Sequence, residues 1–331
     1  MTKVKILATG MYAPKKIMTN NDWKEFVDTS DEWIFERTGI RERHISSRDE
    51  NEFPSDMATY AAADALKTAG LEPNDIDMII FASVNPDYKL PNTASVVQQK
   101  LGITNKCACM DIAAACSGFV YEFNMANSFI KTGLAKKVLV IGSEVLTQEM
   151  DWTDRRSCVL FGDGCGVAIL GASDENDGSE ILATNLGSDG KGGEYFSHPI
   201  GGSVNPVTKE NIENKEVFMR MKGQEMFKMA TRSMAKCAKD AIADAGLSLA
   251  DVNWIIPHQA NIRIIKTVAK LLDAPMEKFI TNIHKYGNTS AASIGMALHE
   301  GITEGKIKRG DIVLLDAFGA GLTYGATLLK Y

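Results

Sequence analysis

Two segments of the 331-residue chain read as copies of each other, and this repeat constrains the fold most strongly. D-A-L-K-T-A-G-L-E-P-N-D-I-D-M-I-I begins at Asp64 and D-A-I-A-D-A-G-L-S-L-A-D-V-N-W-I-I begins at Asp240. Each segment predicts a helix closed by glycine, a short turn and a buried strand. The endings G-V-A-I-L near Gly166 and G-A-T-L-L near Gly325 also resemble each other. The alternative is that βα units look alike by composition alone. We predict two related halves.

The apolar runs predict an α/β chain. Continuous apolar strands are typical of sheets covered on both faces, and they occur at I-I-F-A-S-V, C-M-D-I-A-A-A, K-V-L-V-I-G-S, W-I-I-P and D-I-V-L-L-D-A-F. Helices are expected over Gln224–Ala245, Gln259–Leu272 and Ser290–Glu304. We place the division between residues 1–173 and 174–331, in a polar stretch. The glycine-rich passage from S-D-G-K-G-G-E to I-G-G-S-V-N-P is expected to be a substrate-facing loop.

Composition narrows the class of protein. The chain is 45% apolar and 24% charged, which are ordinary globular values. No apolar run reaches membrane-spanning length, and six cysteines without a pairing pattern fit a reducing compartment, so we expect a cytoplasmic protein that binds no membrane. The net charge of −6 argues against nucleic-acid binding but permits a local basic patch.

Cys116 lies in D-I-A-A-A-C-S-G-F, where an apolar strand over residues 109–114 is expected to give way to a helix beginning at Ser117. At a helix N-terminus, unpaired N–H groups and the helix dipole favour a reactive thiolate. The alternative is a buried packing residue, because free cysteine often behaves as a small hydrophobe. We assign packing roles to the other five cysteines, and their spacing predicts no metal site. These are Cys107, Cys109, Cys158, Cys165 and Cys237.

Two further polar residues follow the same logic. His258, in W-I-I-P-H-Q-A-N, follows a buried strand and precedes a helix, which we interpret as the structural position of Cys116 repeated in the second half. Asn288, in K-Y-G-N-T-S-A-A-S, precedes another helix, and its alternative role is a helix N-cap. The remaining histidines are expected to be surface or packing residues. They are His44, His198, His284 and His299.

Cysteine, histidine and asparagine together admit two chemistries. In a hydrolase, histidine withdraws the cysteine proton and asparagine orients the imidazole ring. In acyl transfer, cysteine accepts an acyl group from a thioester while histidine and asparagine donate hydrogen bonds to a carbonyl that develops enolate charge. The local sequence of papain-like peptidases is absent around Cys116, so acyl transfer is preferred.

Five ordered motifs resemble the β-ketoacyl-acyl carrier protein synthase III family of the thiolase-like superfamily. They are A-A-A-C-S-G-F, I-I-P-H-Q-A-N-I-R-I, Y-G-N-T-S-A-A-S, F-G-D-G-C-G and D-A-F-G-A-G-L-T-Y-G. The segment T-S-D-E-W-I-F-E-R-T-G-I-R-E-R-H-I, residues 29–45, resembles the family's coenzyme A-binding segment. The resemblance implies a duplicated, five-layered αβαβα fold of the α/β class, a homodimer, and no cofactor besides the coenzyme A thioester substrate.

The resemblance further implies decarboxylative Claisen condensation of a short acyl-CoA with malonyl-acyl carrier protein, which starts bacterial type II fatty acid synthesis. Cys116 would carry the acyl group, and His258 and Asn288 would stabilise the enolate. Phe318 would lie beside the malonyl carboxylate, and the Cys116 and Ala320 N–H groups would form an oxyanion hole beside Gly321. Where the family has three consecutive glycines this chain has G-A-G, which is tolerable if the alanine has a negative φ.

The same resemblance implies residues that bind the two substrates. Trp33, Arg37, Arg155, Asn261 and Phe227 would hold coenzyme A. Three basic residues would dock the acidic carrier protein, although as sequence features they could equally be solvated helix faces. These are Lys228, Arg263 and Lys270. Leu90 matches a position that closes the acyl pocket of the partner subunit, where a smaller side chain than phenylalanine would admit primers longer than acetyl.

Several alternatives remain beside this hypothesis. A biosynthetic thiolase would need a second cysteine between Gly319 and Gly325, and an elongating ketoacyl synthase would have histidine in place of Asn288. A related ketosynthase or acyltransferase of secondary metabolism stays open, and a thioester hydrolase or a non-catalytic partner protein are more distant possibilities. The sequence contains no metal, flavin or nicotinamide motif that we can identify.

Overall fold

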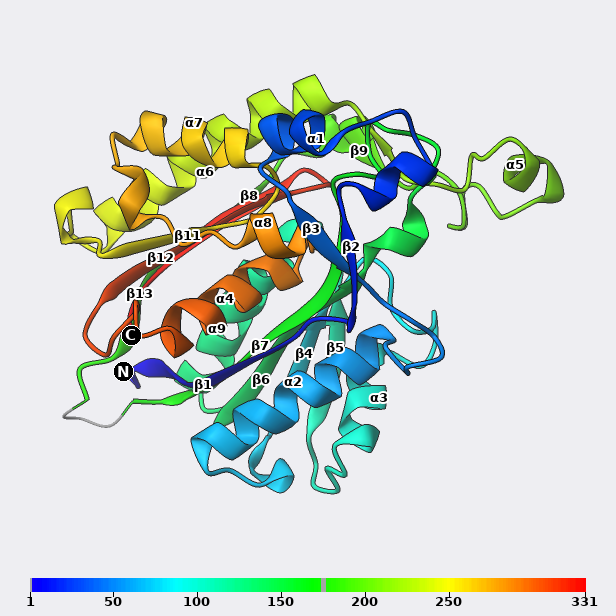
Figure 1. The fold of residues 1–331 in the computed structure, drawn as a ribbon. Helices are drawn as coiled ribbons and strands as arrows, with labels where there is room; N and C mark the ends of the chain where they lie inside the picture. Colours follow the sequence, from blue (N-terminus) through cyan, green and yellow to red (C-terminus); the bar gives the residue numbers. More distant parts are fainter. Residues whose placement is uncertain (1, 174–176) are drawn as a thin grey trace.

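The computed structural model describes residues 2–173 and 177–331. Two β-sheets lie one above the other with helices below, between and above them (Figure 1). This is the five-layered αβαβα arrangement, and the predicted fold class is confirmed. Within the described residues no helix is long and apolar enough to cross a membrane.

The first sheet has five strands in the order β1-β7-β6-β4-β5. β4, β5 and β6 run parallel, whereas β7 is antiparallel to both β6 and β1. Because β4 and β6 are buried on both faces, they read as continuous apolar runs. The bounds are β1 Val4–Tyr12, β4 Met78–Ala82, β5 Ala108–Ile112, β6 Lys137–Val145 and β7 Asp163–Ala172.

The second sheet has four strands in the order β11-β12-β13-β8. β11 and β12 are parallel, and β13 is antiparallel to both neighbours. A single parallel bridge between Ile255 and Phe279 stands where the first sheet has β5. The bounds are β8 Glu180–Ser188, β11 Trp254–Pro257, β12 Ile312–Gly319 and β13 Thr323–Lys330.

Helices form the other three layers. α4 and α9 lie between the sheets, α2 and α3 cover the outer face of the first sheet, and α6 and α7 cover the second (Figure 1). The bounds are α2 Pro54–Ala69, α3 Thr93–Lys100, α4 Gly118–Lys131, α6 Gly223–Asp244, α7 Ile262–Leu272 and α9 Ala292–Thr303. The three predicted helices are present, but the second begins at Ile262 rather than Gln259 because Asn261 caps it.

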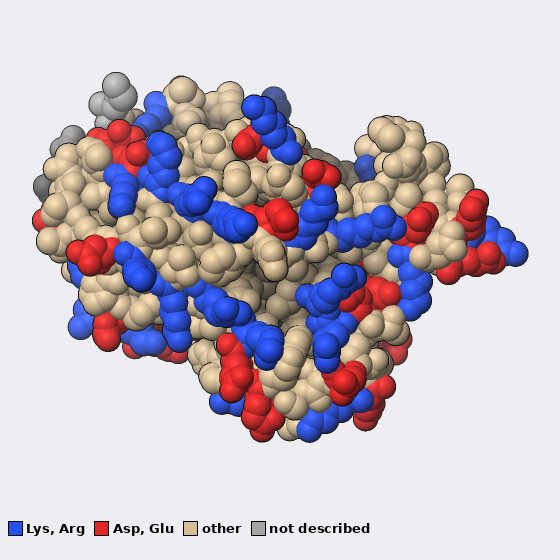
Figure 2. All heavy atoms as spheres, turned by 90° about the horizontal axis from the view of Figure 1, so that it is seen from above, with Lys and Arg blue, Asp and Glu red and all other residues tan. Residues whose placement is uncertain are grey.

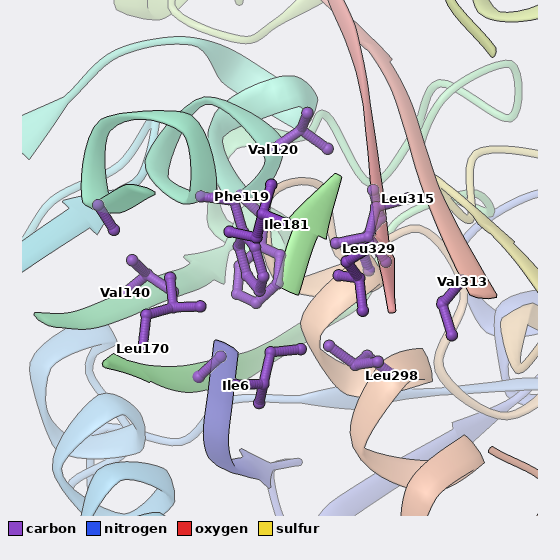
Figure 3. Close-up of a cluster of buried hydrophobic side chains, with 14 of the residues drawn as sticks. Ile6, Phe119, Val120, Val140, Leu170, Ile181, Leu298, Val313, Leu315 and Leu329 are labelled. Carbon is purple, nitrogen blue, oxygen red and sulfur yellow. The ribbon is translucent and has the colours of Figure 1, made fainter. Parts of the chain in front are cut away.

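The central helices pack against both sheets through one hydrophobic cluster. Phe119 and Val120 of α4 meet Val140 of β6 from one side and Leu315 and Leu329 of the second sheet from the other (Figure 3). Because α4 is apolar around much of its circumference, it can be buried between two sheets. This packing fixes the position of the first turn of α4. Cys116 lies in the 3₁₀ turn directly before it.

The internal repeat of the sequence is a repeat of structure. α2 is followed by a 3₁₀ turn and β4, and α6 by a 3₁₀ turn and β11. A glycine in the left-handed region follows both helices, Gly70 directly after α2 at φ 65° and Gly246 one residue beyond the C-cap Ala245 of α6 at φ 68°. The predicted boundary between residues 173 and 174 stays a prediction, because residues 174–176 lie outside the described residues.

Shorter elements surround the upper layer. α1, β2 and β3 form an N-terminal excursion, while the segment between β8 and α6 carries β9, α5 and β10, with α5 projecting from the body (Figure 1). Their bounds are β2 Lys16–Thr19, α1 Asp31–Thr38, β3 Glu42–Ile45, β9 Phe196–Ser197, α5 Lys209–Glu213, β10 Arg220–Met221 and α8 Ile283–Tyr286.

Candidate active site

One cavity of about 290 Å³ brings together the three residues singled out by their chemistry. Cys116, His258 and Asn288 all line it, although they are far apart in the sequence. All three are nearly buried, with Cys116 only 5% exposed. The cavity continues from these buried residues to Trp33 and Arg37 of α1, in the upper layer of the molecule.

Cys116 lies in a 3₁₀ turn, Ala115–Ser117, that leads directly into α4. The preceding residue, Ala115, has a φ of 46°, which is uncommon for a residue with a Cβ. The predicted strand is shorter than expected, since β5 ends at Ile112. The turn directs the cysteine side chain into the cavity beneath the ends of both sheets.

The expectation that Cys116 would be stabilised as a thiolate is wrong for the structure as it stands. Burial raises the pKa of the thiol to about 12, and this outweighs the hydrogen bonds from Ser290 and from its own backbone N–H. The charge of nearby Glu144 raises it further. The free thiol is therefore protonated at neutral pH, and its reaction with a thioester requires a proton acceptor.

His258 follows β11 and is held by Ser293 at the beginning of α9. Its Nδ1 lies 2.8 Å from Ser293 Oγ, and the same oxygen accepts a hydrogen bond from the Gln259 N–H at 3.3 Å. The hydroxyl hydrogen of Ser293 is thus available to Nδ1, which leaves the imidazole proton on Nε2. Burial lowers the pKa of His258 to about 3, so the ring is neutral.

Asn288 precedes α9 but does not cap it, because Ala291 occupies the N-cap position. Its backbone is held against Leu160 and Gly162 by hydrogen bonds of 2.9 and 3.1 Å. Its Oδ1 accepts a hydrogen bond from the Ser290 N–H at 2.9 Å. Because the amide oxygen is occupied, the Nδ2 hydrogens remain to donate into the cavity.

The structural position assigned to His258 needs correction. In the order of the two sheets β11 corresponds to β4, so His258 corresponds to the residues that follow Ala82. The position that matches Cys116 is that of Asn288, because each precedes a helix of the central layer. The sequence pattern of strand, polar residue and helix did not distinguish these cases, since both helices follow strands.

The loop after β12 lies against the cysteine turn. A Cβ on Gly319 would lie 2.7 Å from Cys116 N, so only glycine fits without moving the turn. Ala320 is not among the described residues with positive φ, which agrees with the condition set for replacing glycine there. Gly321 has a φ of 135° and needs to be glycine. Phe318 lines the main cavity.

The predicted coenzyme A residues also line this cavity. Trp33 is half-buried on α1, and the guanidinium carbons of Arg37 and Arg155 lie 4.5 and 4.8 Å from its ring centre. Trp33 is therefore covered by cations, and a nucleotide base would meet this aromatic and cationic group. Phe227 of α6 lies farther along the cavity wall.

Asn261 lines the cavity but its side chain is occupied. It caps α7 by accepting from the Arg263 N–H at 2.8 Å, and its Nδ2 donates to the Arg37 carbonyl at 3.0 Å. It links α7 to α1 and holds the outer part of the cavity in shape.

A second cavity of about 100 Å³ also contains Cys116 and is mainly apolar. Its lining comes from segments far apart in the sequence and includes Val84, Leu146, Phe161, Phe196 and Met219. Phe196 lies in the glycine-rich passage and Met219 in the segment between this passage and α6, so both ends of the excursion contribute to the site while α5 projects away (Figure 1).

Several residues of the site were not predicted from the sequence. His198, expected to be a surface or packing residue, lines the small cavity. Ser290 lies 3.4 Å from Cys116 Sγ, and Ser293 holds His258. The motif Y-G-N-T-S-A-A-S contains both serines. Two hydroxyl groups close to the predicted helix start could therefore have been proposed as site residues from the sequence. Glu144 was also missed, although a carboxyl group inside the apolar strand β6 is an unusual feature.

The structure also places the remaining cysteines and the basic residues predicted from the sequence. The five further cysteines are buried or half-buried, and all five belong to or pack against hydrophobic clusters. Lys228, Arg263 and Lys270 are exposed on α6 and α7, and basic side chains surround a hollow on this face (Figure 2). Arg263 also lines the cavity. Leu90 is 87% exposed.

Among the described residues, no group of three or more His, Cys, Asp or Glu is placed to hold a metal ion.

Comparison with known proteins places this site in a family. Residues 110–190 match the family described as 3-Oxoacyl-[acyl-carrier-protein (ACP)] synthase III, and residues 242–331 match its C-terminal region. The chain is 47% identical over 326 residues to the beta-ketoacyl-[acyl-carrier-protein] synthase III of Caldanaerobacter subterraneus, with 98% of this chain and 97% of the relative covered.

Solved structures agree with this match. The 3-oxoacyl-[acyl-carrier-protein] synthase III of Aquifex aeolicus is 47% identical and superimposes with a TM-score of 0.91 over 99% of this chain and 100% of the other. A priming beta-ketosynthase from the R1128 polyketide biosynthetic pathway is 30% identical, with a TM-score of 0.90 over 99% and 96% of the two chains. The chain belongs to the 3-oxoacyl-[acyl-carrier-protein] synthase III family.

Proposed function

We propose that this protein condenses a short acyl-CoA with malonyl-acyl carrier protein through an acyl-Cys116 intermediate. Members of the family are acyltransferases of the condensing type that act in fatty acid synthesis. The observation that carries the proposal for this chain is the shared cavity of Cys116, His258 and Asn288, which opens at an aromatic and cationic group.

In the first half-reaction, Cys116 attacks the acyl-CoA thioester and the coenzyme A thiolate leaves. The Cys116 and Ala320 N–H groups stabilise the oxyanion, and Gly319 allows the two backbone segments to approach closely. The acyl chain enters the small apolar cavity beside Cys116, and coenzyme A lies along Trp33, Arg37, Arg155, Asn261 and Phe227.

In the second half-reaction, malonyl-acyl carrier protein replaces coenzyme A. His258 Nε2–H and Asn288 Nδ2–H donate to the malonyl thioester oxygen while carbon dioxide leaves, and the carbanion attacks the acyl-cysteine. The neutral state of His258 suits a donor that gains no proton. Phe318 provides a water-poor surface that favours loss of the malonyl carboxylate.

The protein partners are proposed on the same basis. The exposed basic residues Lys228, Arg263 and Lys270 would dock the acidic carrier protein. The almost fully exposed Leu90 supports a homodimer in which this side chain reaches the acyl pocket of the partner subunit. We also propose a cytoplasmic location and catalysis without a metal or organic cofactor.

A priming ketosynthase of secondary metabolism is the second candidate. The related structure from a polyketide pathway has the same fold at 30% identity, so the fold does not separate these roles. The size of the small cavity, about 100 Å³, favours a short primer in either case.

The test is acylation of the protein with acyl-CoAs from acetyl to octanoyl, followed by intact mass, with Cys116→Ala as the control. We expect an acyl adduct in the wild type alone, converted to 3-oxoacyl-acyl carrier protein when malonyl-acyl carrier protein is added. Loss of the adduct to water without that substrate would identify a hydrolase instead. Absence of an adduct with every acyl-CoA would contradict the proposal.

A further inference from the structure

A buried carboxyl group lies behind Cys116 and takes no part in the mechanism described so far. Glu144 is at the end of β6 and is fully buried. Its Oε2 accepts hydrogen bonds from Ser83 Oγ at 2.9 Å and from the Val84 N–H at 3.0 Å. Its Oε1 is buried and has no partner of ordinary hydrogen-bond geometry.

Ser290 lies between this carboxyl and the cysteine. Its Oγ is 3.4 Å from Cys116 Sγ, a hydrogen-bonding distance for sulfur, and it is 2% exposed. The Ser290 hydroxyl and the Ala291 N–H also stabilise the charged form of Glu144. Ser290 has a φ of 49°, a strained conformation that places its side chain between the two groups.

We propose that Glu144 accepts the Cys116 thiol proton through Ser290 during acylation, and returns it when the condensation product leaves. This inference rests on the proposed function. Ser290 contacts the reacting sulfur and exchanges a proton with it, whereas Glu144 acts on the sulfur only through Ser290.

The proton transfers balance in both half-reactions. In the first, the S–H proton moves to Ser290 Oγ while the Ser290 O–H proton moves to Glu144, and the sulfur forms a bond to the acyl carbon. The coenzyme A thiolate leaves and takes a proton from solvent. In the second, the carbanion attacks the acyl carbon, the Cys116 thiolate leaves, and Glu144 returns its proton through Ser290.

The electrostatics of the site fit this assignment. The pKa of Cys116 is too high for the thiolate to form alone, whereas burial raises the pKa of Glu144 only to about 7. A carboxyl in that range accepts and releases a proton near neutral pH. His258 is a poor acceptor because burial lowers its pKa to about 3.

The experiment measures single-turnover acylation of Cys116 by acetyl-CoA, or by another acyl-CoA if the panel described above identifies a better primer. Glu144→Gln and Ser290→Ala are each expected to slow acylation about 100-fold. The double variant is expected to be no slower than either single variant, because both interrupt one relay. The matched control is Glu122→Gln, which removes a second fully buried carboxyl, located on α4, whose two oxygens have no hydrogen-bond partner of ordinary geometry. It is expected to keep the wild-type acylation rate.

A measurement on the wild type tests the relay even if a variant fails to fold. Two protons in flight predict slower acylation in heavy water, with a curved dependence of rate on deuterium fraction. A rate independent of deuterium, an unchanged rate in Glu144→Gln, or losses that multiply in the double variant would each overturn the relay. If the wild type forms no adduct with any acyl-CoA, the proposed function itself fails.

Discussion

The starts of the two central helices show how a duplicated fold acquires different chemistry in each half. Cys116 precedes α4 and Asn288 precedes α9, and both side chains line the same cavity. In the first half a complete edge strand, β5, precedes the functional residue. In the second half a single β-bridge at Phe279 takes the place of that strand. Strain precedes the functional residue in the first half, at Ala115, and follows it in the second, at Ser290.

This difference indicates a division of labour. The fold supplies two helix starts that face each other, and the residue types decide which one carries the acyl group and which one donates hydrogen bonds. The second half adds Ser293 to fix His258 and Ser290 to contact Cys116. Residues of one half thus adjust the reactive group of the other.

Replacing Asn288 gives the sharpest separation of the two helix starts. We expect Asn288→Ala to lower condensation about 100- to 1000-fold, because it removes a preorganised donor to the developing enolate. Formation of acyl-Cys116 should fall much less, through the loss of the hydrogen bond that Asn288 Oδ1 accepts from the Ser290 N–H. Parallel assays of acyl adduct and 3-oxoacyl product check this, and an equal loss in both assays would contradict the division of labour.

Crowding the cysteine turn should affect the first half-reaction. A Cβ at Gly319 would lie 2.7 Å from Cys116 N and 3.1 Å from Ser117 N. We expect Gly319→Ala to displace the turn and slow acylation at least tenfold, with a lower melting temperature. Gly202→Ala is the control, since nothing lies within 4 Å of its added Cβ. Wild-type acylation by Gly319→Ala would show that the turn tolerates movement.

The positioning of His258 should have a smaller effect on the second half-reaction. Ser293→Ala removes the hydroxyl that holds Nδ1, so the ring can lose the Nε2–H tautomer that faces the cavity. We expect condensation to fall about tenfold, the value of one hydrogen bond, with acylation unchanged. A normal condensation rate would mean that packing alone orients the ring.

Much of the fold was predictable because it depends on local patterns. The repeat, the glycine after each helix and the buried apolar strands are consecutive in the sequence, and each keeps its form in the structure. The three polar residues of the site were found for a related reason, since each directly follows or precedes such an element.

The remaining features of the site depend on contacts between distant segments. Ser290 and Cys116 are separated by 174 positions, so no window of sequence could pair them. The raised pKa of Cys116 comes from burial, which depends on the packing of distant segments and not on the local helix start. His198 reaches the small cavity through a long excursion whose path no periodic pattern predicts.

The smallest expected effect comes from alanine substitutions at the two glycines that follow the repeated helices. Gly70 and Gly246 end α2 and α6 at φ values of 65° and 68°, and an added Cβ meets nothing within 4 Å at either place. Alanine at each should therefore cost only the strain of the left-handed conformation, about 1 kcal/mol in the free energy of unfolding. Chemical denaturation of the two variants should give equal losses, with acylation unaffected. Because the surroundings of the two glycines are equally open, a clear inequality would mean that the two halves differ in the helix ends themselves, and not only in the residues placed at the site.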